Sequence, residues 1–310
     1  MKQKIFFSFY IIMLAILLSF VMSVSIFSQE YLYPITLTDD SGAKITFNEK
    51  PQRIISLAPS NTEIIFALGL EDKLVGRSDF CNYPRETQDF ESIGKMFPLN
   101  LEKIVSLEPD IILAFGELNQ LKDITRLREL GLKIVVIQSE SLQSTIQSIK
   151  LISAACGIPE KGDQLIYDMH KRIDQVISRV AILSSDQKPK VFAGSSFDTI
   201  YSPGRGTLFH ELITLAGGQN IIGHLERWVK INPELVAQAE PDIIIIPSGI
   251  MNPEEITKIK NDIISHPGWA QVPAIRNQQI YAVNEDIFYR AGPRLLDALE
   301  LLYEIFIETK

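Results

Sequence analysis

The sequence predicts an α/β fold with two lobes, each built on a central parallel sheet flanked by helices, joined by one long α-helix. The first observation is a repeated segment: Asn100-Leu-Glu-Lys-Ile-Val-Ser-Leu-Glu-Pro-Asp110 returns as Asn232-Pro-Glu-Leu-Val-Ala-Gln-Ala-Glu-Pro-Asp242, and aliphatic residues follow each copy. Each copy is typical of a helix with an Asn N-cap, a Pro-Asp end and a buried parallel strand after it. The second observation is that short aliphatic runs alternate with helical patterns elsewhere. Two similar lobes imply a ligand cleft between them.

The N-terminal residues are typical of a secretory leader. Lys2 and Lys4 precede a long apolar run, and small and polar residues end it, so residues 1–28 are predicted to be a signal peptide. The protein is therefore expected to be exported to the periplasm. The alternative is an uncleaved N-terminal membrane anchor, because the run is long enough to span a bilayer. No Cys lies near the end of the run, which argues against a lipid-anchored form.

Charge and cysteine content narrow the class of protein. The net charge of -8 falls further when residues 1–28 are removed, because they hold two lysines and no acids. Nucleic acid is therefore not expected as a partner. Cys81 and Cys156 are the two cysteines, too few for a disulfide framework. Two free thiols are favoured over one bridge between them.

Residues 29–158 are predicted to form the N-terminal α/β lobe. Ile35 to Phe47 alternates around an Asp-Ser-Gly turn and predicts a β-hairpin. A strand over residues 53–57 then leads into Ser60-Asn-Thr-Glu63, a capping-box pattern, with Gly69 as the helix stop. Further strands are predicted at 74–76, 111–114 and 134–137, and helices at 101–107, 120–130 and 142–155.

Residues 159–186 are predicted to be the linking backbone helix, and residues 187–310 the C-terminal α/β lobe. Pro159 suits the first helical turn, and apolar residues recur at helical spacing to about Leu183. The second lobe begins with a strand from Lys190 to Gly194. Its helices are predicted at 207–215, 233–239, 253–264 and 294–308, and its later strands at 243–246 and 279–283.

Candidate ligand-binding residues lie at the carboxyl ends of these strands, where ligands of open parallel sheets bind. Aromatic side chains recur there in otherwise polar segments and can bind a large, flat, partly apolar ligand. The alternative is that each one packs under its own loop. Arg290 can donate to an amide, carboxylate or phosphate of the ligand, or else form a salt bridge. The candidates from the strand ends are Ser60, Phe80, Tyr83, Phe115, Phe197, Trp228, Tyr289 and Arg290.

Enzymatic motifs are missing from the sequence. There is no Gly-x-Ser-x-Gly elbow, complete dinucleotide loop or P-loop, so the protein is not expected to be an enzyme. The four histidines, His170, His210, His224 and His266, are spread out, and no resident metal site or cofactor is predicted. His224 or a tyrosine remains the candidate if the ligand is haem.

Five segments resemble a known family, the helical-backbone class of periplasmic substrate-binding proteins for ABC importers. They are Arg53 to Gly69, Asp79-Phe-Cys-Asn-Tyr-Pro84, Asn100 to Asp110, Ala216-Gly-Gly-Gln-Asn220 and Gly292-Pro-Arg294. The resemblance covers about residues 35 to 305. The class serves cobalamin, haem and ferric siderophores, and the Asp79 segment is most similar to the vitamin B12-binding members.

The resemblance implies a monomeric protein that delivers cobalamin or a related corrinoid to an ABC permease and its ATPase. Haem or a ferric siderophore is the alternative ligand. Of the candidates above, it implies that Phe80, Phe115, Phe197, Trp228, Tyr289 and Arg290 face the ligand, together with Phe288. Phe97, or Met96, occupies the place of a cleft tryptophan, and Phe97 is added to the candidates.

The resemblance also implies that one acidic residue per lobe docks on the permease. Glu91 falls on the position in the first lobe. In the second lobe the acid is replaced by Gln219, within Gly217-Gly-Gln-Asn220. Gln219 is therefore the second docking candidate by position, with Glu226 or Glu211 as acidic alternatives.

Overall fold

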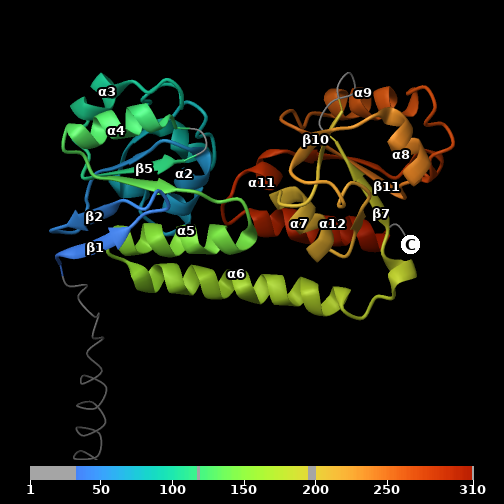
Figure 1. Ribbon diagram of the computed structural model, residues 1–310, viewed down its shortest axis with the longest axis horizontal. Helices are drawn as coiled ribbons and strands as arrows, with labels where there is room; N and C mark the ends of the chain where they lie inside the picture. Colours follow the sequence, from blue (N-terminus) through green and yellow to red (C-terminus); the bar gives the residue numbers. More distant parts are fainter. Residues whose placement is uncertain (1–32, 117–118, 195–199, 309–310) are drawn as a thin grey trace, which may run out of the picture. The chain divides into compact units, whose positions relative to one another are not determined.

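Two parallel sheets organise the chain in the computed structural model, which describes residues 33–116, 119–194 and 200–308 (Figure 1). The strand order is β4-β3-β5-β6 in the first sheet and β12-β11-β7-β9 in the second, and every neighbouring pair is parallel. We call the parts built on these sheets the first lobe and the second lobe. The predicted fold class is confirmed. Pro34–Lys310 forms one compact unit holding both lobes, so the predicted lobe boundaries stay predictions.

The first lobe follows the predicted order of elements. An antiparallel hairpin of β1 (Ile35–Thr38) and β2 (Lys44–Phe47) precedes the sheet. The sheet strands are β3 (Ile54–Ser56), β4 (Leu74–Arg77), β5 (Ile111–Phe115) and β6 (Ile134–Ile137). The helices are α2 (Pro59–Ala67), α3 (Leu101–Ser106), α4 (Leu121–Glu129) and α5 (Leu142–Ala155), with short 3-10 turns at Glu71–Lys73 and Arg85–Asp89. Aliphatic side chains such as Ile55, Ile112 and Ile134 form its core, because a sheet with helices on its faces buries its strands.

The linking helix α6 (Pro159–Val180) begins at the predicted residue and ends slightly earlier than expected. Its 22 residues span roughly 33 Å at the α-helical rise. It packs against α5 in the first lobe and against α12 (Leu295–Glu308) in the second (Figure 1). Arg172 of α6 holds Glu300 of α12 through two nitrogen–oxygen contacts of 2.8 and 2.7 Å, and Asp297 at 2.7 Å.

The second lobe contains the predicted elements and several short ones that the sequence did not indicate. Its sheet strands are β7 (Lys190–Ala193), β9 (Gln219–Asn220), β11 (Ile243–Ser248) and β12 (Ile280–Asn284). Its predicted helices are α7 (Leu208–Leu215), α8 (Pro233–Ala239), α9 (Pro253–Ile264) and α12. The additions are the sheet strand β9, the antiparallel ribbon of β8 (Tyr201–Pro203) and β10 (Trp228–Lys230), helices α10 (Pro273–Arg276) and α11 (Asp286–Tyr289), and a 3-10 turn at Ser185–Gln187. Phe192 and Trp269 meet edge to face in its core.

The repeated segment forms the same helix–strand unit in both lobes. Asn100 caps α3, since its side-chain oxygen accepts the backbone N–H of Lys103 at 3.1 Å. Asn232 caps α8 by accepting the N–H of Glu234 at 3.2 Å. Both predicted N-caps are confirmed.

The aspartate that ends each copy joins it to a neighbouring strand. Asp110 Oδ2 accepts the backbone N–H groups of Gln52 and Arg53, at 2.8 and 2.9 Å, just before β3. Asp242 Oδ2 accepts the N–H of Lys190, the first residue of β7, at 2.8 Å. The repeat therefore fixes where the next strand of each sheet begins.

The predicted capping box at Ser60 and Glu63 is wrong. Helix α2 begins one residue earlier, at Pro59, with Ala58 at the N-cap and no side-chain cap. Pro59 supplies the first helical position without an N–H, and the buried Glu63 side chain pairs with Arg294 instead of capping its own helix. Gly69 adopts φ +64° after the helix, as the predicted stop requires.

The remaining sequence predictions concern the two cysteines and the N-terminal leader. Cys81 and Cys156 are buried free thiols, as favoured, and burial raises the pKa of Cys156 to about 12. Among the helices of the described residues, none combines the length and apolarity needed to cross a bilayer. The predicted leader, residues 1–28, lies outside those residues.

Candidate ligand-binding cleft

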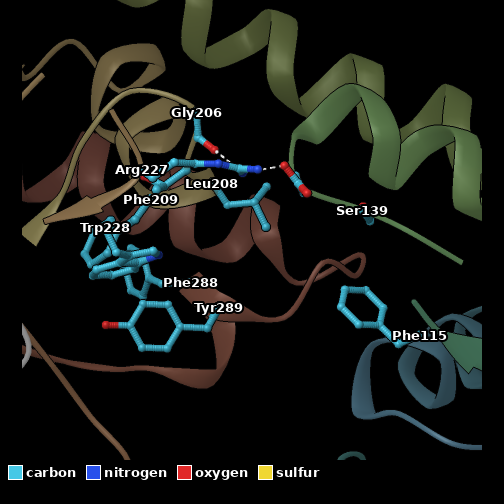
Figure 2. Close-up of a pocket in the computed structure, with 11 residues that line it drawn as sticks. Phe115, Ser139, Gly206, Leu208, Phe209, Arg227, Trp228, Phe288 and Tyr289 are labelled. Carbon is cyan, nitrogen blue, oxygen red and sulfur yellow. Dashed lines mark hydrogen bonds and ion pairs between the residues drawn. The ribbon is translucent and has the colours of Figure 1, made fainter. Parts of the chain in front are cut away.

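A cavity of about 710 Å³ lies between the lobes, at the ends of β5 and β6 (Figure 2). Its size falls within the range of small-molecule sites. The first lobe contributes Phe115, Ser139 and Glu140; the second contributes Gly206, Thr207, Leu208, Phe209, Arg227, Trp228, Phe288 and Tyr289. The first lobe borders the cavity at the ends of two sheet strands, as expected, whereas most of the wall from the second lobe comes from residues outside its predicted strand ends.

The wall from the first lobe has one aromatic side chain. Phe115 is the last residue of β5, and its backbone N–H donates to the side-chain oxygen of Asn119 at 2.7 Å. Ser139 follows β6 and shares a 2.8 Å hydrogen bond with Thr145 of α5. Figure 2 shows the Phe115 ring on the opposite side of the cavity from the other aromatic residues.

The wall from the second lobe is an aromatic cluster of two layers. Trp228 of β10 and Tyr289 of α11 meet edge to face, with ring centroids 5.5 Å apart, and are 42% and 37% exposed. Behind them, Phe209 lies 6.2 Å from the Tyr289 ring and 4.6 Å from that of Phe288. Phe209 and Phe288 are buried. The outer pair is therefore held by a packed inner pair and offers apolar surface to a ligand.

Arg227 connects the lobes at the edge of the cavity. Its Nη1 donates to Glu140 Oε2 at 2.5 Å, and the same nitrogen lies 3.4 Å from the Gly206 carbonyl oxygen (Figure 2). The Arg227 side chain is 62% exposed and that of Glu140 34%, so water screens the pair and its contribution to stability is small. Its position places a cation and an anion beside the aromatic wall.

A second contact between the lobes lies beside the first. Glu211 of α7 accepts the backbone N–H of Leu142, the first residue of α5, at 2.9 Å. Burial raises the pKa of Glu211, although this hydrogen bond acts in the opposite direction. A smaller cavity of about 350 Å³ adjoins Glu211, His210 and Thr214.

The third contact involves Arg290, which was predicted to face the ligand. Its guanidinium donates to Asn82 Oδ1 at 2.6 Å and pairs with Asp286 at 2.7 Å and with Glu63 at 3.4 Å. The salt-bridge alternative is therefore the one that the structure shows. Three acceptors surround a side chain that is 14% exposed, and Arg290 is not among the residues that line the cavity.

The structure brings together four of the ten predicted ligand-binding residues. Phe115, Trp228, Phe288 and Tyr289 belong to the cavity lining, although Phe288 is fully buried and supports the wall from behind. Phe197 lies outside the described residues.

The other predicted residues do not line this cavity. Ser60 is buried near the start of α2, and Phe80 and Phe97 are exposed, at 52% and 50%. Tyr83 lies under the Arg294 guanidinium, whose centre is 3.7 Å from the ring centroid, and borders a different cavity of about 670 Å³. A cation over an aromatic face is favourable, which explains the position of Tyr83.

Seven residues of the cavity lining were not among the predicted ones: Ser139, Glu140, Gly206, Thr207, Leu208, Phe209 and Arg227. Glu140 and Arg227 carried a usable signal, because Glu140 closely follows a predicted strand and Arg227 precedes Trp228. Nothing in the sequence marks Phe209 as a cleft residue, since an aromatic residue on the apolar face of a helix is typical of core packing.

Residues 54–287 match the sequence profile of the periplasmic binding protein family. The chain belongs to this family. The uncharacterized ABC transporter substrate-binding lipoprotein YvrC of Bacillus subtilis is 32% identical over 88% of this chain and 85% of its own length. The vitamin B12-binding protein of Vibrio cholerae is 32% identical over 80% of this chain and 87% of its own length.

Solved structures of similar proteins bear out the resemblance found in the sequence. The periplasmic vitamin B12-binding protein BtuF of Vibrio cholerae aligns with a TM-score of 0.69 and 30% identity, covering 84% of this chain and 98% of that one. The periplasmic heme-binding protein RhuT of Roseiflexus sp. RS-1 aligns with a TM-score of 0.73 and 26% identity, covering 83% and 98%. The family is shared by proteins named for different ligands.

The two predicted docking positions of this periplasmic binding protein differ in chemistry. Glu91 is exposed and forms an ion pair with Lys103, which lowers the pKa of the Glu91 carboxyl. Gln219 donates from Nε2 to the carbonyl oxygens of Ser185 and Lys188, both at 3.1 Å. The amide of Gln219 thus holds the segment that leads into β7.

The one titratable aromatic group in the cavity stays protonated at neutral pH. Burial, and secondarily the Glu285 carboxylate, raises the pKa of Tyr289. Burial also raises the pKa of Glu285, with Asp286 adding to the effect. Within the described residues, no group of three or more His, Cys, Asp or Glu side chains could hold a metal ion.

Proposed function

We propose that this protein is an exported substrate-binding protein that captures cobalamin or a related corrinoid in the cleft and delivers it to an ABC permease and its ATPase. Membership of the periplasmic binding protein family supports the transport role. The observation that carries the ligand proposal is the aromatic wall of Trp228 and Tyr289 opposite Phe115. Similarity to a protein named for vitamin B12 binding supports the same ligand.

The physical basis of capture would be apolar burial with few charges. A corrin ring is large and flat, and a wall of exposed aromatic surface on a rigid inner layer can cover its face or edge. Ser139 and Thr207 add hydroxyl groups, and Arg227 adds a cation, at the border of this surface. Such polar groups fix orientation more than they supply affinity.

Calorimetric titration of the mature protein tests the ligand directly. We expect cyanocobalamin or cobinamide to bind tightly with one-to-one stoichiometry, and haemin to bind more weakly. The absence of tight corrinoid binding would sink the corrinoid proposal while leaving the family assignment intact.

Haem is the second candidate, because a similar solved protein is named for heme binding and Tyr289, a residue type that can bind haem iron, lines the cavity. His224 is exposed and does not line the cavity. A Soret band on adding haemin that disappears in Tyr289→Phe would favour haem.

Delivery is proposed to involve Glu91 on the first lobe. Electrostatic complementarity between exposed charges mainly raises the rate of encounter. Glu91→Ala should therefore leave ligand affinity unchanged and reduce uptake by the reconstituted transporter, more at low salt than at high salt. Uptake that is unchanged at both salt concentrations would count against a docking role. Gln219→Glu, which restores an acid at the second position but loses the hydrogen bonds from Nε2 to Ser185 and Lys188, should raise uptake if both positions dock and urea unfolding shows the variant to be folded.

A further inference from the structure

One carboxylate of the first lobe is buried between two arginines of the second. Glu63 of α2 has a side chain that is 2% exposed. Arg294 forms a bidentate ion pair with this carboxylate: its Nε donates to Oε2 at 2.9 Å and its Nη2 donates to Oε1 at 2.5 Å. Arg290 approaches Oε1 at 3.4 Å. We call Glu63, Arg290 and Arg294 the interlobe anchor.

The anchor is joined to the aromatic wall through the chain itself. Arg290 directly follows Tyr289, and its pair with Asp286 closes across the four-residue helix α11. Its third partner, Asn82, belongs to the first lobe. The contacts of the Arg290 guanidinium with Asn82 and Asp286 therefore restrain the end of α11, next to Tyr289.

The segment after α11 is also fitted closely to Glu63. A Cβ atom added at Gly292 would lie 3.3 Å from Glu63 Oε2, so a side chain there would press on the carboxylate. Arg294 is fixed from its other face by the Tyr83 ring. The anchor thus constrains the chain on both sides of Gly292.

A buried ion pair is an expensive way to stabilise a fold, because both charges lose their hydration. Where one is retained, its best-attested value is that it specifies one arrangement of the surrounding elements. The chain holds a matched comparison, the two-contact pair of Arg172 and Glu300 between α6 and α12, whose side chains are 36% and 39% exposed. That pair has similar chemistry but lies outside the cavity lining.

We propose that Glu63, Arg290 and Arg294 are positioning residues for the ligand site: they hold α11 against the first lobe and so fix Tyr289 relative to Phe115 across the cavity. The binding consequence rests on the proposed function. The mechanical consequence, that α11 is tied to Glu63, does not depend on any ligand.

The test compares Glu63→Gln and Arg290→Gln with the control Glu300→Gln in the full mature protein. Hydrogen–deuterium exchange of residues 286–292 without ligand measures whether α11 is held. Calorimetry with cyanocobalamin, cobinamide and haemin measures affinity for whichever compound the wild-type protein binds. Arg290→Gln leaves the Glu63–Arg294 pair in place and keeps the test usable if Glu63→Gln does not fold.

Both anchor variants should show faster exchange in residues 286–292 and about tenfold weaker binding, and Glu300→Gln should show neither. In a Tyr289→Ala background the Glu63→Gln change should cost little further affinity, because the anchor acts through Tyr289. Wild-type exchange in folded anchor variants, or equally fast exchange in Glu300→Gln, would overturn the proposal. If the wild-type protein binds none of the three compounds, the proposed ligands fail while the exchange result still decides the anchor.

Discussion

The two lobes are alike in scaffold and different where they face the ligand. Both place an Asn-capped helix, a Pro-Asp end and a parallel strand in the same order, and both use the aspartate to join the neighbouring strand. At the cavity, the first lobe presents Phe115 with polar neighbours, whereas the second presents a supported aromatic cluster. The difference indicates that the repeated unit builds the scaffold of each lobe, while residues outside the repeat provide most of the side chains that line the cavity.

The largest expected effect comes from removing the aromatic wall of the second lobe. Trp228→Ala should weaken binding of the ligand about 10- to 100-fold, because a large aromatic contact area is lost. Phe115→Ala should weaken it by less, about tenfold at most, since Phe115 has 9% of its surface exposed. Calorimetry measures both.

A matched control is Tyr167→Ala, which removes an exposed ring on α6 outside the cavity and should leave affinity unchanged. Equal losses of affinity in Trp228→Ala and Phe115→Ala would mean that the two walls contribute alike to ligand binding. The structural contrast between the lobes would then have no counterpart in binding energy.

An intermediate effect is expected from the repeated aspartates. Asp110 accepts two backbone N–H groups and Asp242 accepts one from the next strand, so their losses should differ. Asp110→Ala should lower the free energy of unfolding by about 2 kcal/mol and Asp242→Ala by about 1 kcal/mol. Urea unfolding measures the difference, with Asp262→Ala on the exposed face of α9 as the control. Indistinguishable losses would show that the number of hydrogen bonds is not what separates the two copies.

The scaffold could be predicted from the sequence because its signals are local. Asn100 and Asn232 cap helices that begin at the next residue, so each N-cap can be recognised from the adjacent sequence. The aliphatic strands can be recognised from their own residues, without knowing which strand pairs with them. Helices α5, α8 and α9 begin and end at the predicted residues. The short strands β8, β9 and β10 were missed because two or three residues are too few to show a period.

The parts of the cleft that could not be predicted depend on partners far away in the chain. The Ser60 to Glu63 pattern is the same whether Glu63 returns to its own helix or reaches Arg294, and only the fold decides between them. Arg290 was ambiguous for the same reason. Phe209 could not be recognised as part of the cleft, because a ring that packs the interior and also supports Tyr289 has the same sequence pattern as any core residue.

The smallest expected effect concerns a strain that the two copies share. Glu108 and Glu240 precede the Pro-Asp ends and adopt φ values of 45° and 48°, in the left-handed region that favours glycine. Both side chains are exposed. Replacing either by Gly should raise the free energy of unfolding by about 0.5 kcal/mol, because relief of the strained φ outweighs the extra entropy of the unfolded chain.

The informative outcome of that experiment is the similarity of the two values. Ligand affinity should not change in Glu108→Gly or Glu240→Gly, since neither residue lines the cavity. Equal gains measured by urea unfolding would extend the likeness of the copies from geometry to energetics. A gain in one lobe with a loss in the other would instead show that the lobes hold the same backbone conformation for different reasons, and the repeat would then explain the shape of the scaffold but not its stability.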